Sequence, residues 1–247
     1  MTKLISLGII LPCFNESQQI ENTFNELKNQ IQNLMNKNII KNVVICFVDD
    51  GSLDNTWNKI INIKKIVSQN EKIKITGIKF SKNFGHQYAL LAGIKNLKNK
   101  VDCILTMDSD LEQDIKVLPE FISNFLNGNE IVLGIRKKRK SLSVFKLVTA
   151  KLFYIIANLL KLNLEREHAD YRLISSRVAH EISNHNEYYI FLRGLIKNIG
   201  FKTSKVYYNE DQKLNRKSRY TKIKMIELAI NGITSYSITP IRLLSLI

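Results

Sequence analysis

The sequence predicts an α/β fold, with a Rossmann-like, mostly parallel sheet flanked by helices. Short apolar runs alternate with helix-period segments over the first 134 residues. Most of these runs are apolar on both faces, as expected for parallel strands buried between layers of helices. Such a sheet is doubly wound and binds its ligands at the carboxyl ends of its strands. Polar clusters at those ends are therefore the first candidates for a functional site.

Five strands are expected in this region, at 4–11, 43–49, 73–80, 102–107 and 130–134. Between the first two, apolar residues recur at spacings of four and three, which predicts one face of an amphipathic helix: Ile20, Phe24, Leu27, Ile31 and Leu34. The second helix has a less regular stripe and Asp54 as its N-cap. Its expected apolar positions are Trp57, Ile60, Ile61 and Val67.

The pattern changes after residue 134. A basic run at 136–140 leads into a long amphipathic segment that ends near Leu162. The later elements expected are a strand or turn at 170–175, helices at 177–183 and 189–199, a strand at 202–208 and an amphipathic helix at about 221–236. No internal repeat or low-complexity linker separates these parts. We therefore expect one domain over 1–236, with 137–162 as an amphipathic segment, and a tail at 237–247.

Composition points to an anionic partner. Lys and Arg number 37 against 22 acidic residues, a net charge of +15. This balance is typical of proteins that bind nucleic acid, phosphorylated small molecules or an acidic membrane, although a general bias toward Lys, Asn and Ile contributes to it. Cys13, Cys46 and Cys103 lie in or beside apolar runs without Cys-x-x-Cys spacing, which favours buried thiols in the reducing cytosol. No secretory pattern and no apolar run of roughly 20 residues occur.

Three of the expected strands end in acidic or amide side chains. These are Asn15 with Glu16, Asp49 with Asp50, and Asp108 with Asp110. Each cluster alone could be turn chemistry. Together they would place like charges on one edge, which is unfavourable unless a cation or hydrogen-bond donors offset them. Carboxylates two residues apart can reach one Mg²⁺ or Mn²⁺ ion, which would bridge a diphosphate and neutralise a departing nucleotide.

Seven segments carry a family resemblance that covers nearly the whole chain in order. Four resemble family 2 glycosyltransferases of the GT-A fold: Pro12-Cys13-Phe14-Asn15-Glu16, Val48-Asp49-Asp50-Gly51-Ser52, Ser81-Lys82-Asn83-Phe84-Gly85-His86-Gln87 and Asp108-Ser109-Asp110-Leu111. Three resemble the polyprenyl-phosphate glycosyltransferases, the group of dolichol-phosphate mannose synthase and bactoprenol glucosyltransferase: Asp170-Tyr171-Arg172-Leu173, Phe191-Leu192-Arg193-Gly194 and Arg216-Lys217-Ser218-Arg219-Tyr220.

The resemblance implies an inverting transferase. It would move a hexose from a nucleotide-diphosphate sugar, UDP-glucose or similar, to a polyprenyl phosphate such as undecaprenyl or dolichyl phosphate, in cell-envelope glycan assembly or modification. Residues 1–236 would then form the GT-A catalytic domain. The implied cofactor is Mg²⁺ or Mn²⁺.

The resemblance also implies roles for individual residues. The catalytic residues would be Asp108, Asp110, Arg172 and Arg193, and the metal ligands Asp108, Asp110 and Glu112. The nucleotide sugar would be bound by Pro12, Phe14, Asn15, Glu16, Asp49, Asp50, Lys82, Asn83 and Ser109. The acceptor or the diphosphate would be bound by Arg136, Arg216 and Arg219.

The chain departs from the family pattern at three places. Glu112 stands where members usually carry Gln, and Gln113 is next to it. A glutamate there would make the metal site more acidic. Asp114-Ile115 replaces the usual Pro-Pro, which should leave the start of the following helix less rigid, and Ala169 replaces a Gly.

An acceptor phosphate is anionic at neutral pH and needs no strong general base, but cations must hold it in line. Arginine suits that task through its planar fork of donors. Segment 137–162 would be a core-packing helix or, as the resemblance favours, a helix lying in the anionic membrane interface. The tail resembles the family's approach to the membrane, where two transmembrane helices usually follow. We expect an enzyme at the cytoplasmic face of the membrane, either peripheral or anchored by segments beyond residue 247. A homo-oligomer is compatible with this expectation.

Three rival interpretations remain. A hydroxyl-directed transferase of the same fold would need a carboxylate base and commonly carries Gln-x-x-Arg-Trp, whereas the only tryptophan here is Trp57. A basic nucleic-acid-binding α/β module explains the charge but not three acidic strand ends, which would repel phosphates, so no nucleic-acid partner is expected. A nucleotidyltransferase is disfavoured because no Gly-rich phosphate loop follows the first strand.

Overall fold

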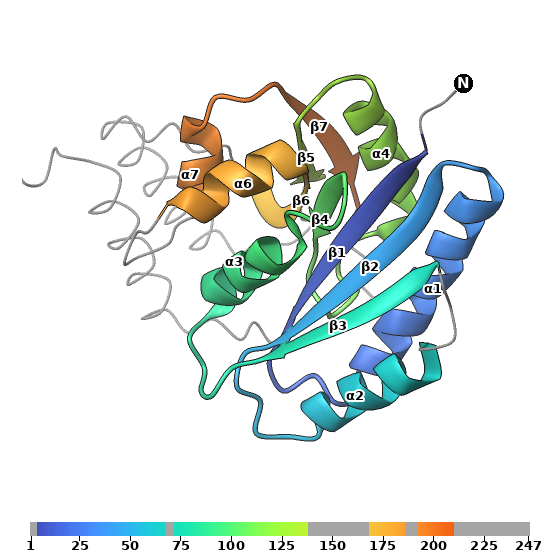
Figure 1. Cartoon of the computed structure of the whole chain (residues 1–247), viewed down its shortest axis with the longest axis vertical. Coiled ribbons are helices and arrows are strands. Elements are labelled where there is room, and N and C mark those ends of the chain that lie inside the picture. The colour runs from blue at the N-terminus through green and yellow to red at the C-terminus, as the bar shows by residue number, and fades with distance from the viewer. Residues whose placement is uncertain (1–3, 68–71, 138–167, 186–191, 210–247) are drawn as a thin grey trace, which may run out of the picture.

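A computed structural model describes residues 4–67, 72–137, 168–185 and 192–209. Two layers of helices enclose one seven-stranded sheet (Figure 1). Its elements in chain order are β1 (Ile5–Cys13), α1 (Ile20–Asn36), β2 (Ile40–Asp49), α2 (Thr56–Val67), β3 (Ile73–Lys79), α3 (His86–Leu97), β4 (Cys103–Thr106), the 3₁₀ turn η1 (Ile115–Val117), α4 (Leu118–Leu126), β5 (Ile131–Arg136), β6 (His168–Ser175), α6 (Ser176–Asn184), α7 (Leu192–Asn198) and β7 (Thr203–Tyr208).

The sheet confirms the predicted mostly parallel architecture. Its strand order is β3-β2-β1-β4-β6-β5-β7. β1 pairs in parallel with β2 and β4, and β3 and β7 pair in parallel with β2 and β5. β6, expected as a strand or a turn, is a strand that lies antiparallel to both β4 and β5. It therefore begins at the edge where the parallel strands end. Its first residues lie at the same edge of the sheet as the predicted site residues.

The core is divided between the two faces of the sheet. On one face, alternate side chains of β1 pack with α1, α2 and α4. On the other, Ile10 of β1 and Ile104 of β4 pack with α3, α6 and α7. The predicted stripe of α1 is confirmed, because all five of its apolar residues are buried. The three cysteines are free and buried, as predicted.

The prediction for α2 was partly wrong. Ile63, and not Ile61, joins Ile60 and Val67 in the buried stripe, because the spacing that faces the sheet begins at Thr56. Asp54 lies at the start of the helix as expected, where its carboxylate accepts the N–H of Thr56 at 3.0 Å. Burial alone would raise the pKa of Asp54, but hydrogen bonds from Thr56 and Ser17 lower it to about 2.

Several predictions fall on residues outside the described ranges. They are the amphipathic segment 137–162 beyond residue 137, the start of the predicted helix at 189–199, the helix at 221–236 with Arg216 and Arg219 before it, and the tail at 237–247. Within the described ranges, no helix has both the length and the apolar character needed to cross a bilayer.

Candidate functional site

The loops after β1 and β2 are tied to each other by backbone-to-side-chain hydrogen bonds. The Asn15 N–H donates to Ser52 Oγ at 2.9 Å, and the Leu53 N–H donates back to Asn15 Oδ1 at 2.9 Å. The Glu16 N–H donates to Thr56 Oγ1 at 2.8 Å. Asn15 has a φ of 55°, a conformation that asparagine tolerates better than most residues. These hydrogen bonds hold the predicted nucleotide-binding residues of the two loops next to each other. The amide oxygen of Asn15 is one of the acceptors in this network.

Asp49 and Asp50, at the end of β2, do different work. Asp50 accepts the N–H of Phe84 at 2.8 Å and the N–H of Gly85 at 2.9 Å. It therefore anchors the loop that carries the predicted residues Lys82 and Asn83. Burial raises its pKa in spite of these donors. Asp49 Oδ1 accepts the N–H of Ser52 at 3.0 Å, whereas its Oδ2 is buried with no partner in the described part of the chain. That oxygen has spare acceptor capacity for a ligand donor.

Gly51 lies in the loop after β2, close to the backbone of Lys82, and its replacement should destabilise the protein. Its φ is +69°, and a Cβ there would lie 2.3 Å from the backbone carbonyl carbon of Lys82. Gly128 has a similar φ of +83°, but a Cβ added there would meet no other atom within 4 Å. We expect Gly128→Ala to cost about 1–2 kcal/mol of unfolding free energy through φ alone, and Gly51→Ala clearly more because backbone must move. Urea denaturation of both variants measures the difference. Equal losses would contradict the close approach.

The loop after β4 folds back on itself. Gln113 is almost fully buried, and its Nε2 donates to Asp108 Oδ2 at 2.7 Å while its Oε1 accepts the Asp108 N–H at 3.0 Å. Asp110 Oδ1 accepts the N–H of Glu112 at 3.1 Å, across Leu111, which has a φ of 59°. The predicted residue Ser109 is buried, and its carbonyl accepts Thr23 Oγ1–H at 2.6 Å.

The start of the next helix carries a capping carboxylate where the family usually has Pro-Pro. Asp114 is the N-cap of η1, and its side chain accepts the Lys116 N–H at 2.9 Å. The Tyr171 hydroxyl of β6 donates to the Asp114 carbonyl at 3.2 Å. The capping carboxylate and this link to β6 therefore hold the segment that proline would otherwise stiffen.

The antiparallel strand β6 adds a further carboxylate to this edge. Thr106 of β4 pairs with Arg172, and its hydroxyl donates to the Asp170 carbonyl at 2.6 Å. Continuing the register by two residues sets Asp170 beside Asp108. The His86 Nε2 atom, at the start of α3, lies 3.4 Å from Asp170 Oδ2 and 3.7 Å from Asp108 Oδ1. His86 thus bridges the two carboxylates.

Two arginines balance Asp170. Arg172 NH2 pairs with Asp170 Oδ1, and Arg193 of α7 donates to both oxygens, Nε to Oδ1 and NH2 to Oδ2, each at 3.3 Å. Gln87 Nε2 donates to Asp170 Oδ2 at 3.2 Å, and Gln87 Oε1 accepts the N–H of Leu192, which ties α3 to α7. Burial alone would raise the pKa of Asp170, but Arg193 and Arg172 hold it well below its usual range.

The predicted catalytic residues therefore differ in access. The Arg172 side chain is 2% exposed, so its charge acts on the site through Asp170. The Arg193 side chain is 39% exposed and can face a ligand directly. The pKa of Asp108 is raised by burial and by the charges of Asp110 and Asp170, against the lowering effect of His86 and Arg193. The pKa of His86 is raised by its bond to Asp170 and by Asp108, against the effect of burial.

The remaining predicted residues lie around this group. Pro12 is buried within β1, and Phe14 is partly exposed at its end. Lys82 and Asn83 are exposed on the loop that Asp50 anchors. Arg136 lies at the carboxyl end of β5, which β6 separates from β4, so the structure does not bring it beside Asp108.

Four residues of this group were not assigned roles from the sequence: His86, Gln87, Gln113 and Asp170. A signal for Asp170 existed. An arginine set among apolar residues in a strand needs a counter-charge, and the residue two positions earlier is on the same face. Gln113 had no comparable signal, because its contact with Asp108 depends on the turn at Leu111.

The donor set suits a hard divalent cation. Asp108 and Asp110 offer carboxylate oxygens, and a cation would offset the like charges that raise the pKa of Asp108. In the described ranges, no three acidic, histidine or cysteine side chains gather into a metal-holding group. An ion here would have two carboxylates and would take further oxygens from a ligand or from Glu112, whose place as a ligand stays a prediction. Mg²⁺ and Mn²⁺ commonly bind in this way beside phosphates.

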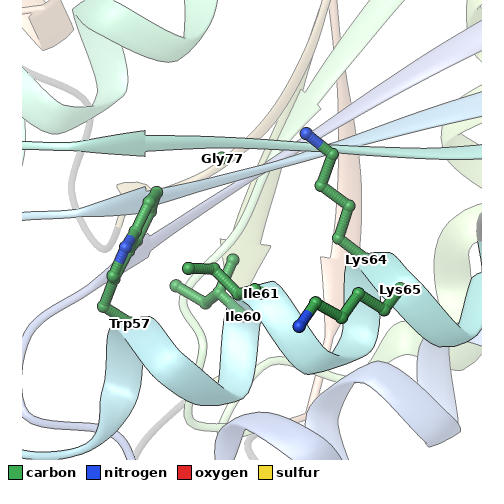
Figure 2. Close-up of a pocket in the computed structure, with 6 residues that line it drawn as sticks. All are labelled: Trp57, Ile60, Ile61, Lys64, Lys65 and Gly77. Carbon is green, nitrogen blue, oxygen red and sulfur yellow. The ribbon is translucent and has the colours of Figure 1, made fainter.

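A cavity of about 500 Å³ lies elsewhere, between α2 and the edge strand β3. Figure 2 shows the indole of Trp57 and the side chain of Ile60 beside Gly77, with Lys64 and Lys65 further along the helix. Its lining contains no acidic residue. The cavity is therefore separate from the carboxylate group and is not the candidate site.

Comparison with known proteins agrees with this arrangement. Residues 8–183 match the domain "Glycosyl transferase family 2". The uncharacterized glycosyltransferase YkoT of Bacillus subtilis is 40% identical over 242 residues, which are 98% of this chain and 70% of that protein. The bactoprenol glucosyl transferase of Shigella phage SfV is 30% identical over 239 residues, 96% of this chain and 74% of that protein.

A solved structure supports the fold. The mannosyltransferase PcManGT of Pyrobaculum calidifontis, in complex with GDP-Man and Mn²⁺, superposes with a TM-score of 0.56 at 12% identity, over 86% of this chain and 59% of that one. The sheet and its helices are those of a GT-A fold. The chain belongs to glycosyl transferase family 2 and is a glycosyltransferase.

Proposed function

We propose that this glycosyltransferase moves a hexose from a nucleotide-diphosphate sugar to a polyprenyl phosphate at a membrane surface, with inversion at the anomeric carbon. One observation carries the proposal. The two described segments that resemble polyprenyl-phosphate glycosyltransferases, at Asp170–Arg172 and Leu192–Arg193, meet at the Asp170 carboxylate, and His86 lies between that carboxylate and Asp108. Relatives named bactoprenol glucosyl transferases, at 30% identity along 96% of the chain, support it.

The donor would lie along the edge formed by β1, β2 and β4. The tied loops at Asn15 and Ser52 give a floor for the nucleoside, and Asp49 Oδ2 offers a buried acceptor for a base or ribose donor. Asp108 and Asp110 would hold Mg²⁺ or Mn²⁺ against the diphosphate. That ion would neutralise the charge that develops on the leaving nucleotide.

The acceptor would approach from the side of β6 and α7. A lipid phosphate is already an oxyanion, so the protein's task is to position it and to offset its repulsion from the diphosphate. Arg193 is partly exposed and held by Asp170, so its guanidinium is oriented in advance. His86 lies on the same side, with its Nε2 atom 3.4 Å from Asp170 Oδ2 and 3.7 Å from Asp108 Oδ1. Arg136, Arg216 and Arg219 stay predictions as further phosphate contacts.

A hydroxyl acceptor is the rival within the same family. It would need a carboxylate base that is free to take a proton. Asp170 is the carboxylate in the right place, but two arginines hold its pKa well below its usual range, which makes it a poor base. This observation favours an acceptor that is already ionised.

The test is an incubation of the full chain with labelled UDP- and GDP-sugars, Mg²⁺ or Mn²⁺, and either undecaprenyl phosphate or undecaprenol. We expect label in the lipid extract with the phosphate and none with the free alcohol, lost on chelation of the metal. Label transferred only to soluble hydroxyl acceptors would overturn the lipid-phosphate proposal and leave the family assignment intact.

A further inference from the structure

The contact between Gln113 and Asp108 is a closed pair of hydrogen bonds. The primary amide of Gln113 donates to the Asp108 carboxylate at 2.7 Å and accepts the Asp108 backbone N–H at 3.0 Å. Gln113 is only 2% exposed, so water does not compete for these bonds. Two bonds to the side chain and backbone of one residue fix the rotation of that side chain about its χ angles.

The pair distinguishes the two oxygens of Asp108. Oδ2 accepts the amide proton of Gln113, and Oδ1 is turned toward His86, 3.7 Å away. Because one lobe of Oδ2 is occupied, Oδ1 is the oxygen with the greater capacity for a cation. The neighbouring Glu112 is held differently, since its backbone N–H is bonded to Asp110 Oδ1 and the turn at Leu111 separates it from β4.

We propose that Gln113 is the positioning residue of the metal site, which holds Asp108 so that Oδ1 is presented to the divalent cation. The inference rests on the proposed function only in assuming that the cation binds at Asp108. Metal-ligating carboxylates are commonly held by such hydrogen bonds, and loss of the partner typically weakens metal binding by about 10–100-fold. The resemblance implies Glu112 as a metal ligand, whereas the residue that the contacts place against Asp108 is the next one, Gln113.

The experiment measures Mn²⁺ binding by the full chain without any sugar transfer. Free Mn²⁺ is followed by electron paramagnetic resonance, with UDP or GDP present and absent. We expect Gln113→Leu, which removes both bonds at similar volume, to raise the Kd for Mn²⁺ about tenfold or more. Gln32→Leu, the same change on the exposed face of α1, should leave that Kd unchanged.

Two further variants separate positioning from folding. Gln113→Glu keeps an acceptor for the Asp108 N–H but sets a second carboxyl group against Asp108 Oδ2, so it should also weaken Mn²⁺ binding when the Kd is measured well below the lowered melting temperature of the variant. In an Asp108→Ala background, Gln113→Leu should change the residual Mn²⁺ affinity less than about twofold, because the group that it holds is gone.

Several outcomes would overturn the inference. One is a Gln113→Leu protein with a lower melting temperature but a Kd for Mn²⁺ within about twofold of the wild type. Another is a wild-type chain that binds no Mn²⁺ at millimolar concentration under any of these conditions. Weakened Mn²⁺ binding in Gln113→Leu alongside a failed lipid transfer assay would sustain the inference and overturn only the proposed acceptor.

Discussion

Replacement of Asp110 by Asn should abolish sugar transfer, with kcat/KM falling by roughly 10³-fold or more at fixed Mg²⁺ or Mn²⁺. Asparagine retains an oxygen that can accept the Glu112 N–H, so the loop after β4 keeps its shape. The variant removes the negative charge that would hold the cation beside Asp108. The loss therefore reports on the metal site and not on the fold.

The control for this change is Asp114→Asn, in the same loop. Asn also caps helices well, so the bond to the Lys116 N–H survives while the charge is lost. We expect activity within about twofold of the wild type. Transfer of labelled sugar to lipid, measured over a range of metal concentrations, distinguishes the two. An Asp110→Asn enzyme that keeps about a tenth of wild-type activity would exclude Asp110 as an essential ligand.

Replacement of Asp170 by Asn should destabilise the protein by about 3–5 kcal/mol, the largest effect on folding that we expect. Asp170 is the counter-ion of Arg172, which is almost fully buried, and of Arg193. Two further nitrogens of Arg172 have no hydrogen-bond partner in the described residues, so the loss of Asp170 would leave an uncompensated buried charge. Urea denaturation measures the change. Lys59→Gln, which breaks the exposed pair with Glu21, should cost about 1 kcal/mol or less.

The contacts of Asp170 with Arg172 and Arg193 also predict how the stability of the protein depends on pH. The pKa of Asp170 is lowered on folding, so its contribution is present above the unfolded value of about 3.9 and is lost as the pH falls through the folded value. The difference in unfolding free energy between the wild type and Asp170→Asn should shrink as the pH falls below about 4. Above about pH 6.5 it should also decline, because Asp170 raises the pKa of His86 and the stability from that contact is lost as His86 deprotonates. A difference that already shrinks as the pH is lowered from about 6 to about 5 would contradict the placement of the arginines.

The parallel part of the fold was predictable because its signals are local. The strands around β1, β2 and β4 are continuous apolar runs, and the spacing from Ile20 to Leu34 marks a helix face without any knowledge of neighbours. The acidic strand ends were predictable for the same reason, since they directly follow the apolar runs in the sequence. The prediction failed at Ile63, because the irregular apolar stripe of α2 did not show which face of the helix is buried.

The rest of the site depends on contacts between distant segments. Asp170 reaches Asp108 because β6 inserts antiparallel between β4 and β5, and neither the direction nor the place of a strand is encoded in its own residues. Asp50 was predicted to bind the nucleotide, and nothing in the sequence indicated that its carboxylate accepts the backbone N–H groups of Phe84 and Gly85. The contact of Gln113 with Asp108 could not be predicted from the sequence, because it depends on the turn at Leu111.

The central position of β6 also bears on the order in which the chain can fold during synthesis. Its neighbours β4 and β5 end at Thr106 and Arg136, but β6 begins only at His168, so a growing chain presents both partners well before the strand that joins them. β1 to β4 can assemble as they emerge, because β1 pairs with β2 and β4 and β2 pairs with β3, whereas β5 must wait. A nascent or truncated chain that ends before β6 would expose the apolar edge of β4 and should aggregate or recruit chaperones.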